Sequence, residues 1–176
     1  MQRYHPVLVT LHWLMALMVL VSLTAGSVFL ENMPNDHPDK IFALTGHMSA
    51  GIAIGVLLVL RLVTRIRTPK PPRATTGNAL LDRISICVHW GFYVLIAGMV
   101  LSGLATALGT GLFPIVFGGA AETLPLDLFD LPQRAVHGWV ASALGALILL
   151  HVAAALYHQL VLKDGLLRRM WFGPRS

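Results

Sequence analysis

The sequence contains very little cysteine and little charge. Cys87 is the single cysteine among 176 residues, which excludes an intrachain disulfide, a Cys-x-x-Cys-His site for covalently attached haem and a four-cysteine iron–sulfur cluster. Because Cys87 lies in an apolar stretch, we expect it to be a small core residue. Charged residues make up 12% of the chain, whereas soluble domains carry about a quarter. The sequence also lacks a nucleophile–base array and a phosphate-binding loop, which argues against hydrolysis and phosphoryl transfer.

Long apolar runs take the place of the missing charge. Hydrophobic residues make up 56% of the chain, and the mean hydropathy is +0.71. Four windows, about Val7–Leu30, Ile41–Val63, Ile84–Leu108 and Val136–Leu162, reach the roughly 20 residues that a membrane-spanning helix requires. They lack the alternation of barrel strands. We therefore predict an all-α integral membrane protein, a four-helix transmembrane bundle forming a single domain over residues 1–176, with the first run retained as a helix.

The basic residues are concentrated on one side of this predicted bundle. If both termini lie in the cytoplasm, eleven of the thirteen Lys and Arg residues face it. Such an asymmetry is the positive-inside signal of membrane proteins. The sequence pI of about 10 is therefore interpreted as a topology signal, and nucleic acid is not an expected partner. The eleven residues are Arg3, Arg61, Arg65, Arg67, Lys70, Arg73, Arg83, Lys163, Arg168, Arg169 and Arg175, and the other side holds Lys40 and Arg134 against Glu31, Asp36, Asp39, Glu122, Asp127 and Asp130.

Several histidines lie inside the apolar runs, where an ionisable side chain indicates function by default. On the fourth helix, His137 and His151 are 14 residues apart, a rise of about 21 Å. At about 100° per residue, they share one face. This separation is too long for one metal ion and favours two haem centres stacked across the membrane.

Matching the depths of the histidines pairs them. His47 and His137 lie near the outer ends of their helices, which predicts an outer pair. His151 lies in the cytoplasmic half together with His12 and His89, so the inner pair is His151 with either His12 or His89. Two histidines can fill both axial positions of a haem iron, as in electron-transfer haems. His158 and the histidine left over could bind a polar ligand such as a quinone carbonyl.

Taken together, these residues resemble the bacterial cytochrome b561 family over nearly the whole chain. The marks of the resemblance are Arg3-Tyr4 with Leu11-His-Trp-Leu14, Gly46-His47 followed by Arg61-Leu62 and Arg65, His89, and His137 with the His151–His158 segment. The family consists of short four-helix di-haem proteins of the bacterial inner membrane, embedded in membrane lipid.

The resemblance implies two b haems, the inner on His12 and His151 and the outer on His47 and His137. It further implies superoxide oxidation at the periplasmic side with reduction of ubiquinone, and it places His89 and His158 at the quinone site. Lys40 and Arg134 precede His47 and His137 by seven and three residues. We therefore predict that they attract the superoxide anion.

Two other hypotheses remain open. The chain could be a cytochrome b subunit that passes electrons between a partner dehydrogenase or hydrogenase and the quinone pool. It could also be a haem-free channel or structural bundle.

Overall fold

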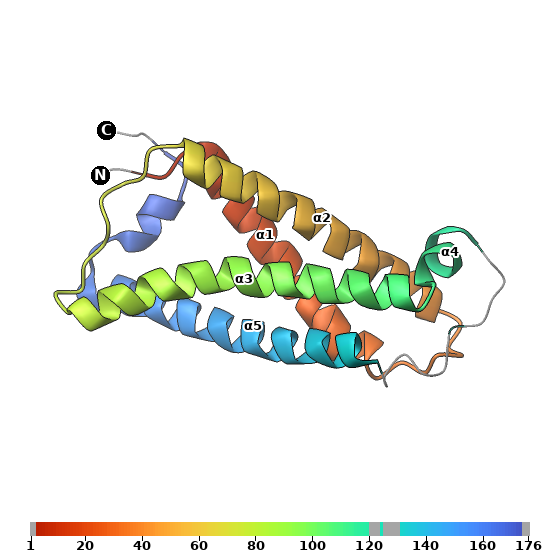
Figure 1. The fold of residues 1–176 in the computed structure, drawn as a ribbon. Coiled ribbons are helices and arrows are strands. Elements are labelled where there is room, and N and C mark those ends of the chain that lie inside the picture. Colours follow the sequence, from red (N-terminus) through yellow and green to blue (C-terminus); the bar gives the residue numbers. More distant parts are fainter. Residues whose placement is uncertain (1–2, 120–123, 125–130, 174–176) are drawn as a thin grey trace.

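Four long helical stretches run side by side in the computed structural model, which describes residues 3–119, 124 and 131–173. Helix α1 (Pro6–Thr24) continues through the wider turns of η1 (Ala25–Leu30), and α5 (Pro132–Tyr157) continues into η2 (His158–Leu162). Between them lie α2 (Lys40–Arg67), α3 (Ala79–Gly109) and the short α4 (Leu112–Phe117), and η3 (Leu166–Met170) follows η2. Figure 1 shows both chain ends at one end of the bundle, here called the terminal end, and α4 at the opposite, loop end.

The four predicted spans are confirmed as helices, and their boundaries differ from the expected ones for local reasons. Helix α2 stays helical through Arg67 and ends where Thr68 precedes a proline. Helix α3 begins five residues earlier than predicted because the Asn78 side chain accepts hydrogen bonds from the N–H groups of Leu80 and Leu81. All four are long and apolar enough to cross a membrane, and no strand occurs among the described residues.

The helices pack as two hairpins joined along one edge. Helix α1 packs mainly on α2, α3 packs mainly on α5, and α2 also contacts α3. A cluster of buried apolar side chains fills the middle of the bundle. It consists of Met15, Val19, Ile54, Ile96 and Leu144. The outer faces remain apolar and uncovered, as Phe42 at 82% exposure illustrates. Lipid is the solvent that suits such faces.

Cys87 is not the core residue that its apolar surroundings predicted. The structure places it exposed on the outside of α3. In a membrane protein, the lipid-facing side of a helix is as apolar as its packed side. The composition around Cys87 therefore could not distinguish the two, and the prediction was wrong for that reason.

The loop end is closed by α4, which packs against α2 and α3. Its side chains Leu112, Ile115 and Val116 are buried. Gly111 precedes α4 with φ +66, a left-handed conformation that glycine adopts without strain. Four charged residues that entered the topology prediction, Glu122, Asp127, Asp130 and Arg175, lie outside the described residues.

Candidate haem-binding histidine pairs

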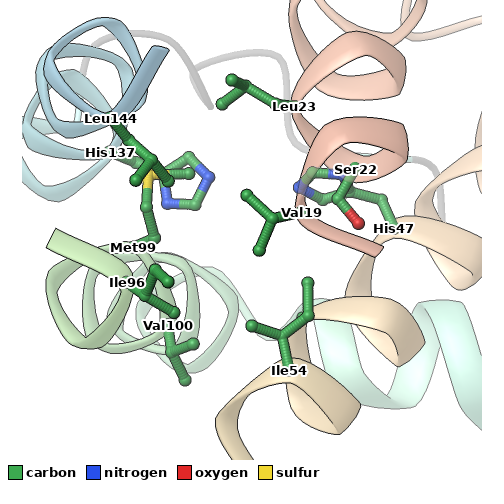
Figure 2. Close-up of a pocket in the computed structure, with 11 residues that line it drawn as sticks. Val19, Ser22, Leu23, His47, Ile54, Ile96, Met99, Val100, His137 and Leu144 are labelled. Atoms are coloured by element: carbon green, nitrogen blue, oxygen red, sulfur yellow. The ribbon is translucent and has the colours of Figure 1, made fainter. Parts of the chain in front are cut away.

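The histidine pair at the loop end is assembled from α2 and α5. The ring centres of His47 and His137 lie 6.2 Å apart. Figure 2 shows the two rings projecting from opposite sides into one pocket. The pocket and its open mouth together hold about 440 Å³ of space not filled by protein atoms, and apolar side chains such as Ile96, Met99 and Leu144 line the pocket. The structure thus brings together the two histidines that their depths in the sequence paired.

Hydrogen bonding leaves one nitrogen of each ring available. The Ser102 hydroxyl donates to the Gly98 carbonyl, and the Ser102 oxygen lies 3.1 Å from His137 Nδ1. His137 Nδ1–H can therefore donate to Ser102, which leaves Nε2 as an electron-pair donor. His47 Nδ1 is buried without a hydrogen-bond partner in the described part of the chain. A buried polar atom without a partner costs about 1–3 kcal/mol, and a ligand that reaches His47 Nδ1 would offset that cost.

Two glycines make room for these rings. A Cβ atom on Gly26 would lie 3.2 Å from His47 Cε1, and a Cβ atom on Gly103 would lie 3.2 Å from His137 Cε1. Both distances are shorter than ordinary van der Waals contact. The sequence analysis missed both glycines. A glycine inside an apolar helix was the available signal, but it also fits plain helix packing.

Three histidines from three helices meet at the terminal end. The ring centres of His12 and His151 lie 6.3 Å apart, and those of His89 and His151 lie 5.6 Å apart. Phe92 packs edge-on against His151 at 5.2 Å. His89 Nδ1 lies 2.6 Å from the Ser85 carbonyl, so it donates there and leaves Nε2 unblocked. The structure thus gathers both candidate partners of His151 around it.

The spacing of the two pairs would allow each pair to hold one metal ion. A nitrogen ligand lies about 2 Å from a transition-metal ion, and an imidazole centre lies about 1 Å behind its nitrogen. Two rings that face each other across one ion are therefore separated by about 6 Å, which fits both the His47–His137 and the His12–His151 distances. No group of three or more His, Cys, Asp or Glu suited to a bare metal ion occurs among the described residues. A haem supplies the remaining ligands itself, so these pairs fit a haem better than a free ion.

Beyond these pairs lies His158, at the start of η2. Its Nδ1 lies 2.5 Å from an oxygen of Asp164, and the side chains are 12% and 33% exposed. The other Asp164 oxygen accepts a hydrogen bond from the Leu166 N–H at 2.9 Å. The structure therefore orients His158 through a carboxylate that the sequence analysis did not single out.

Lys40 and Arg134 both lie at the loop end but in different surroundings. Lys40 is 4% exposed, and its ammonium donates to the carbonyls of Leu30 and Met33 at 2.7 and 2.6 Å. It thus binds carbonyl groups at and just beyond the end of η1. Arg134 is half-buried in the first turn of α5. Their predicted role in attracting an anion stays a prediction.

Comparison with known proteins defines the class. Residues 3–173 match the family model described as prokaryotic cytochrome b561. A protein of Yersinia pestis named "Probable superoxide oxidase CybB" is 31% identical over 173 residues, covering 96% of each chain. The Cereibacter sphaeroides protein named "Cytochrome b562" is 29% identical over 95% of this chain and 94% of its own. The Escherichia coli protein named "Cytochrome b561 homolog 2" is 25% identical over 96% of this chain and 91% of its own.

The chain is therefore a multi-pass membrane protein of the electron-transferring kind. It belongs to the prokaryotic cytochrome b561 family. This confirms the resemblance drawn from the sequence, and membership implies haem b as the cofactor.

Proposed function

We propose that the chain transfers electrons across the bacterial inner membrane, oxidising superoxide at the loop end and reducing ubiquinone at the terminal end. The observation that carries this proposal is the presence of two facing histidine pairs, 6.2 and 6.3 Å between ring centres, at opposite ends of one apolar bundle. Haem b bound between such pairs would accept and release one electron at a time. One pair near each membrane face is what electron transfer across the membrane needs.

The residue assignment follows the pairs. We propose that His47 and His137 would hold the loop-end haem, and that His12 and His151 would hold the terminal-end haem. The His12–His151 distance matches the loop-end pair more closely than the His89–His151 distance does. His89 then remains, with His158, to bind the quinone. Because both have a carbonyl or carboxylate near Nδ1, each can direct Nε2 toward a quinone oxygen.

The bundle separates the two sites with apolar side chains. Leu144 is 2% exposed and lies seven residues from both His137 and His151 on α5. It packs with Met15, Val19, Ile54 and Ile96. This layer excludes water between the sites, so electrons can cross while protons cannot follow through the core.

The overall reaction balances when two protons are taken up. Two superoxide ions give up one electron each and leave as two dioxygen molecules. The two electrons and two protons convert one quinone to one quinol. Lys40 and Arg134 would raise the local superoxide concentration at the loop end. The basic residues at the terminal end support a cytoplasmic location of both termini by the positive-inside rule.

The relative of Yersinia pestis named as a probable superoxide oxidase supports this activity. A second candidate function is a cytochrome b subunit that exchanges electrons between a partner dehydrogenase or hydrogenase and the quinone pool. The relatives named as cytochromes b561 and b562 are compatible with it, because their names state a cytochrome and no superoxide oxidation. Such a subunit would co-purify with its partner in fixed stoichiometry and would be reduced by that partner rather than by superoxide.

Two measurements test the proposal. Purified oxidised protein is mixed with superoxide in a stopped-flow spectrometer, with and without a ubiquinone analogue. Rapid appearance of reduced b-haem bands and their quinone-dependent decay is expected. A haem that stays oxidised with superoxide but is reduced by quinol would favour the cytochrome b subunit of a partner enzyme. A haem-free preparation would contradict both candidate functions.

Haem counting tests the ligands separately. Substituting alanine for His12, His47, His137 or His151 should lower the haem content from two per chain to one. His89→Ala should keep both haems. If His89→Ala lost one haem and His12→Ala kept both, His89 would be the haem ligand and His12 would remain for the quinone.

A further inference from the structure

Two arginines of α2, Arg61 and Arg65, lie near the histidines of the terminal end, on the side of the bundle where the basic residues are concentrated. Arg61 follows His47 by 14 residues, the same interval that separates His137 from His151. It therefore lies on the face of α2 that carries His47, about 21 Å further along the helix. Its guanidinium is within electrostatic range of His12, His89 and His151.

The contacts of Arg61 are all with uncharged or positively charged groups. Its Nη1 donates to the Leu8 carbonyl at 2.9 Å. Its other electrostatic neighbours are Arg65, Tyr93 and Tyr4, in addition to the three histidines. In the described part of the chain, neither Arg61 nor Arg65 forms an ion pair with a carboxylate. A half-buried guanidinium without a counter-ion is costly, because the Coulomb attraction that would offset its desolvation is missing.

Tyr93 supplies a third polar group to the same place. Arg65 lies over the rings of Trp90 and Tyr93, 5.6 and 5.7 Å from their centres, which fixes the guanidinium above α3. The Tyr93 oxygen is buried beside Arg61 without a hydrogen bond of ordinary geometry to any described residue. Two fixed cations and one unsatisfied hydroxyl therefore converge next to the His12–His151 pair.

We propose that Arg61, Arg65 and Tyr93 form an oxyanion site, and that its occupant is a carboxylate of the haem bound at the terminal end. Arginine binds carboxylates and phosphates through its planar array of donors, and a phenol adds one more donor. A haem carries two carboxylates that need such partners in an apolar environment. The phosphate of an anionic phospholipid offers the same oxyanion chemistry as a second source. This inference rests on the proposed assignment of haem to His12 and His151.

The site has a consequence for electron transfer. A fixed positive charge near a haem stabilises its reduced form, so it raises the midpoint potential. Arg61 and Arg65 would therefore raise the midpoint potential of the terminal-end haem, and Arg134, which lies within electrostatic range of His47 and His137, would act in the same direction on the loop-end haem.

The test compares holoprotein variants in nanodiscs by redox titration and by infrared difference spectroscopy. Haem is labelled with ¹³C at its carboxylates through labelled 5-aminolevulinate. Arg61→Gln and Tyr93→Phe should lower the midpoint potential of one haem and shift the labelled carboxylate band. Arg67→Gln, which removes an exposed charge from the same helix, should do neither. Tyr93→Phe matters because it leaves the Arg61–Leu8 hydrogen bond in place.

Lipid composition distinguishes the two sources. Three results together would identify the occupant as a lipid phosphate. The midpoint potential of the wild type would depend on phosphatidylglycerol content, this dependence would be lost in Arg61→Gln, and the labelled carboxylate band would not shift in any variant. If Arg61→Gln and Tyr93→Phe change neither potential, band nor lipid dependence while both haems remain bound, the oxyanion site is refuted and the proposed function stands. A wild type that binds no haem at the terminal end would instead refute the haem assignment.

Discussion

His158 Nδ1 lies 2.5 Å from Asp164 Oδ2, and the second oxygen of Asp164 is held by the Leu166 N–H. The carboxylate thus connects the end of the last membrane helix to the turn that follows it. Asp82 of α3 also lies within electrostatic range of His158, and Arg169 lies within range of Asp164. A histidine bound to a carboxylate through Nδ1 presents its Nε2 in a fixed direction. This arrangement suits a group that binds a quinone oxygen.

Asp164→Asn is expected to reduce the acid sensitivity of the protein. Burial raises the pKa of Asp164, but the hydrogen bonds from His158 and Leu166 outweigh it, and the net pKa lies below the ordinary value. A lowered folded-state pKa stabilises the fold above the unfolded pKa of about 3.9, and this stabilisation is lost as the pH falls through the folded value. Thermal unfolding measured from pH 7 to pH 3 should show that the difference in unfolding temperature between wild type and Asp164→Asn becomes smaller as the pH falls.

The exposed Asp36 at the opposite end offers the matched control. Asp36→Asn should unfold like the wild type at every pH. If the difference in unfolding temperature between wild type and Asp164→Asn stayed constant with pH, the His158–Asp164 interaction would not depend on the charge of Asp164.

Lys40→Gln is expected to destabilise the loop end. Lys40 donates to two carbonyls while 4% exposed, so removing the ammonium leaves buried acceptors unpaired. Such a loss costs about 1–3 kcal/mol in the free energy of unfolding. Chemical unfolding in detergent measures it, with Lys70→Gln, an exposed lysine of the α2–α3 linker, as the control. Equal stability of the two variants would show that the hydrogen bonds of Lys40 do not stabilise the fold.

The helices and the outer histidine pair could be predicted from the sequence because both depend on regular spacing. A rise of about 1.5 Å per residue converts 14 residues between His137 and His151 into a depth difference, and depth alone paired His47 with His137. The same logic left His12 and His89 undecided, since both lie at the depth of His151. Only the packing of three helices shows that both contact it.

Other features depended on side-chain contacts that spacing does not encode. Cys87 was assigned to the core, although it faces outward, because lipid and core demand the same composition. Asp164 lies in a polar turn whose direction depends on Lys163, which adopts φ 51. Lys40 was predicted from its charge to help attract superoxide, and the hydrogen bonds from its ammonium to the Leu30 and Met33 carbonyls could not be predicted from spacing.

The orientation of the bundle can be measured with single cysteines. Cys87 is exposed and forms no disulfide, so Cys87→Ser should leave folding unchanged and provide a cysteine-free background. In that background, Arg73→Cys lies at the terminal end and Asp36→Cys at the loop end, and both positions are exposed. A membrane-impermeant maleimide should label Asp36→Cys in intact spheroplasts and Arg73→Cys only in inverted vesicles. The reverse pattern would place the proposed superoxide site in the cytoplasm.

Adding one methyl group beside each loop-end histidine is expected to weaken haem binding there. In Gly26→Ala and Gly103→Ala, the new Cβ would lie 3.2 Å from Cε1 of His47 or His137, so the ring must move by a few tenths of an ångström. Overpacking of this kind costs about 1–3 kcal/mol, and a displaced ring no longer meets its partner at the 6.2 Å separation. The haem-to-protein ratio should therefore fall below two in both variants while the terminal-end haem remains. Gly46→Ala is the matched control, because its Cβ would meet nothing within 4 Å, and alanine in a helix favours folding by roughly 0.5–1 kcal/mol. It should keep both haems and unfold at slightly higher temperature, whereas haem loss in all three variants would show that any added methyl group disturbs this end of the bundle.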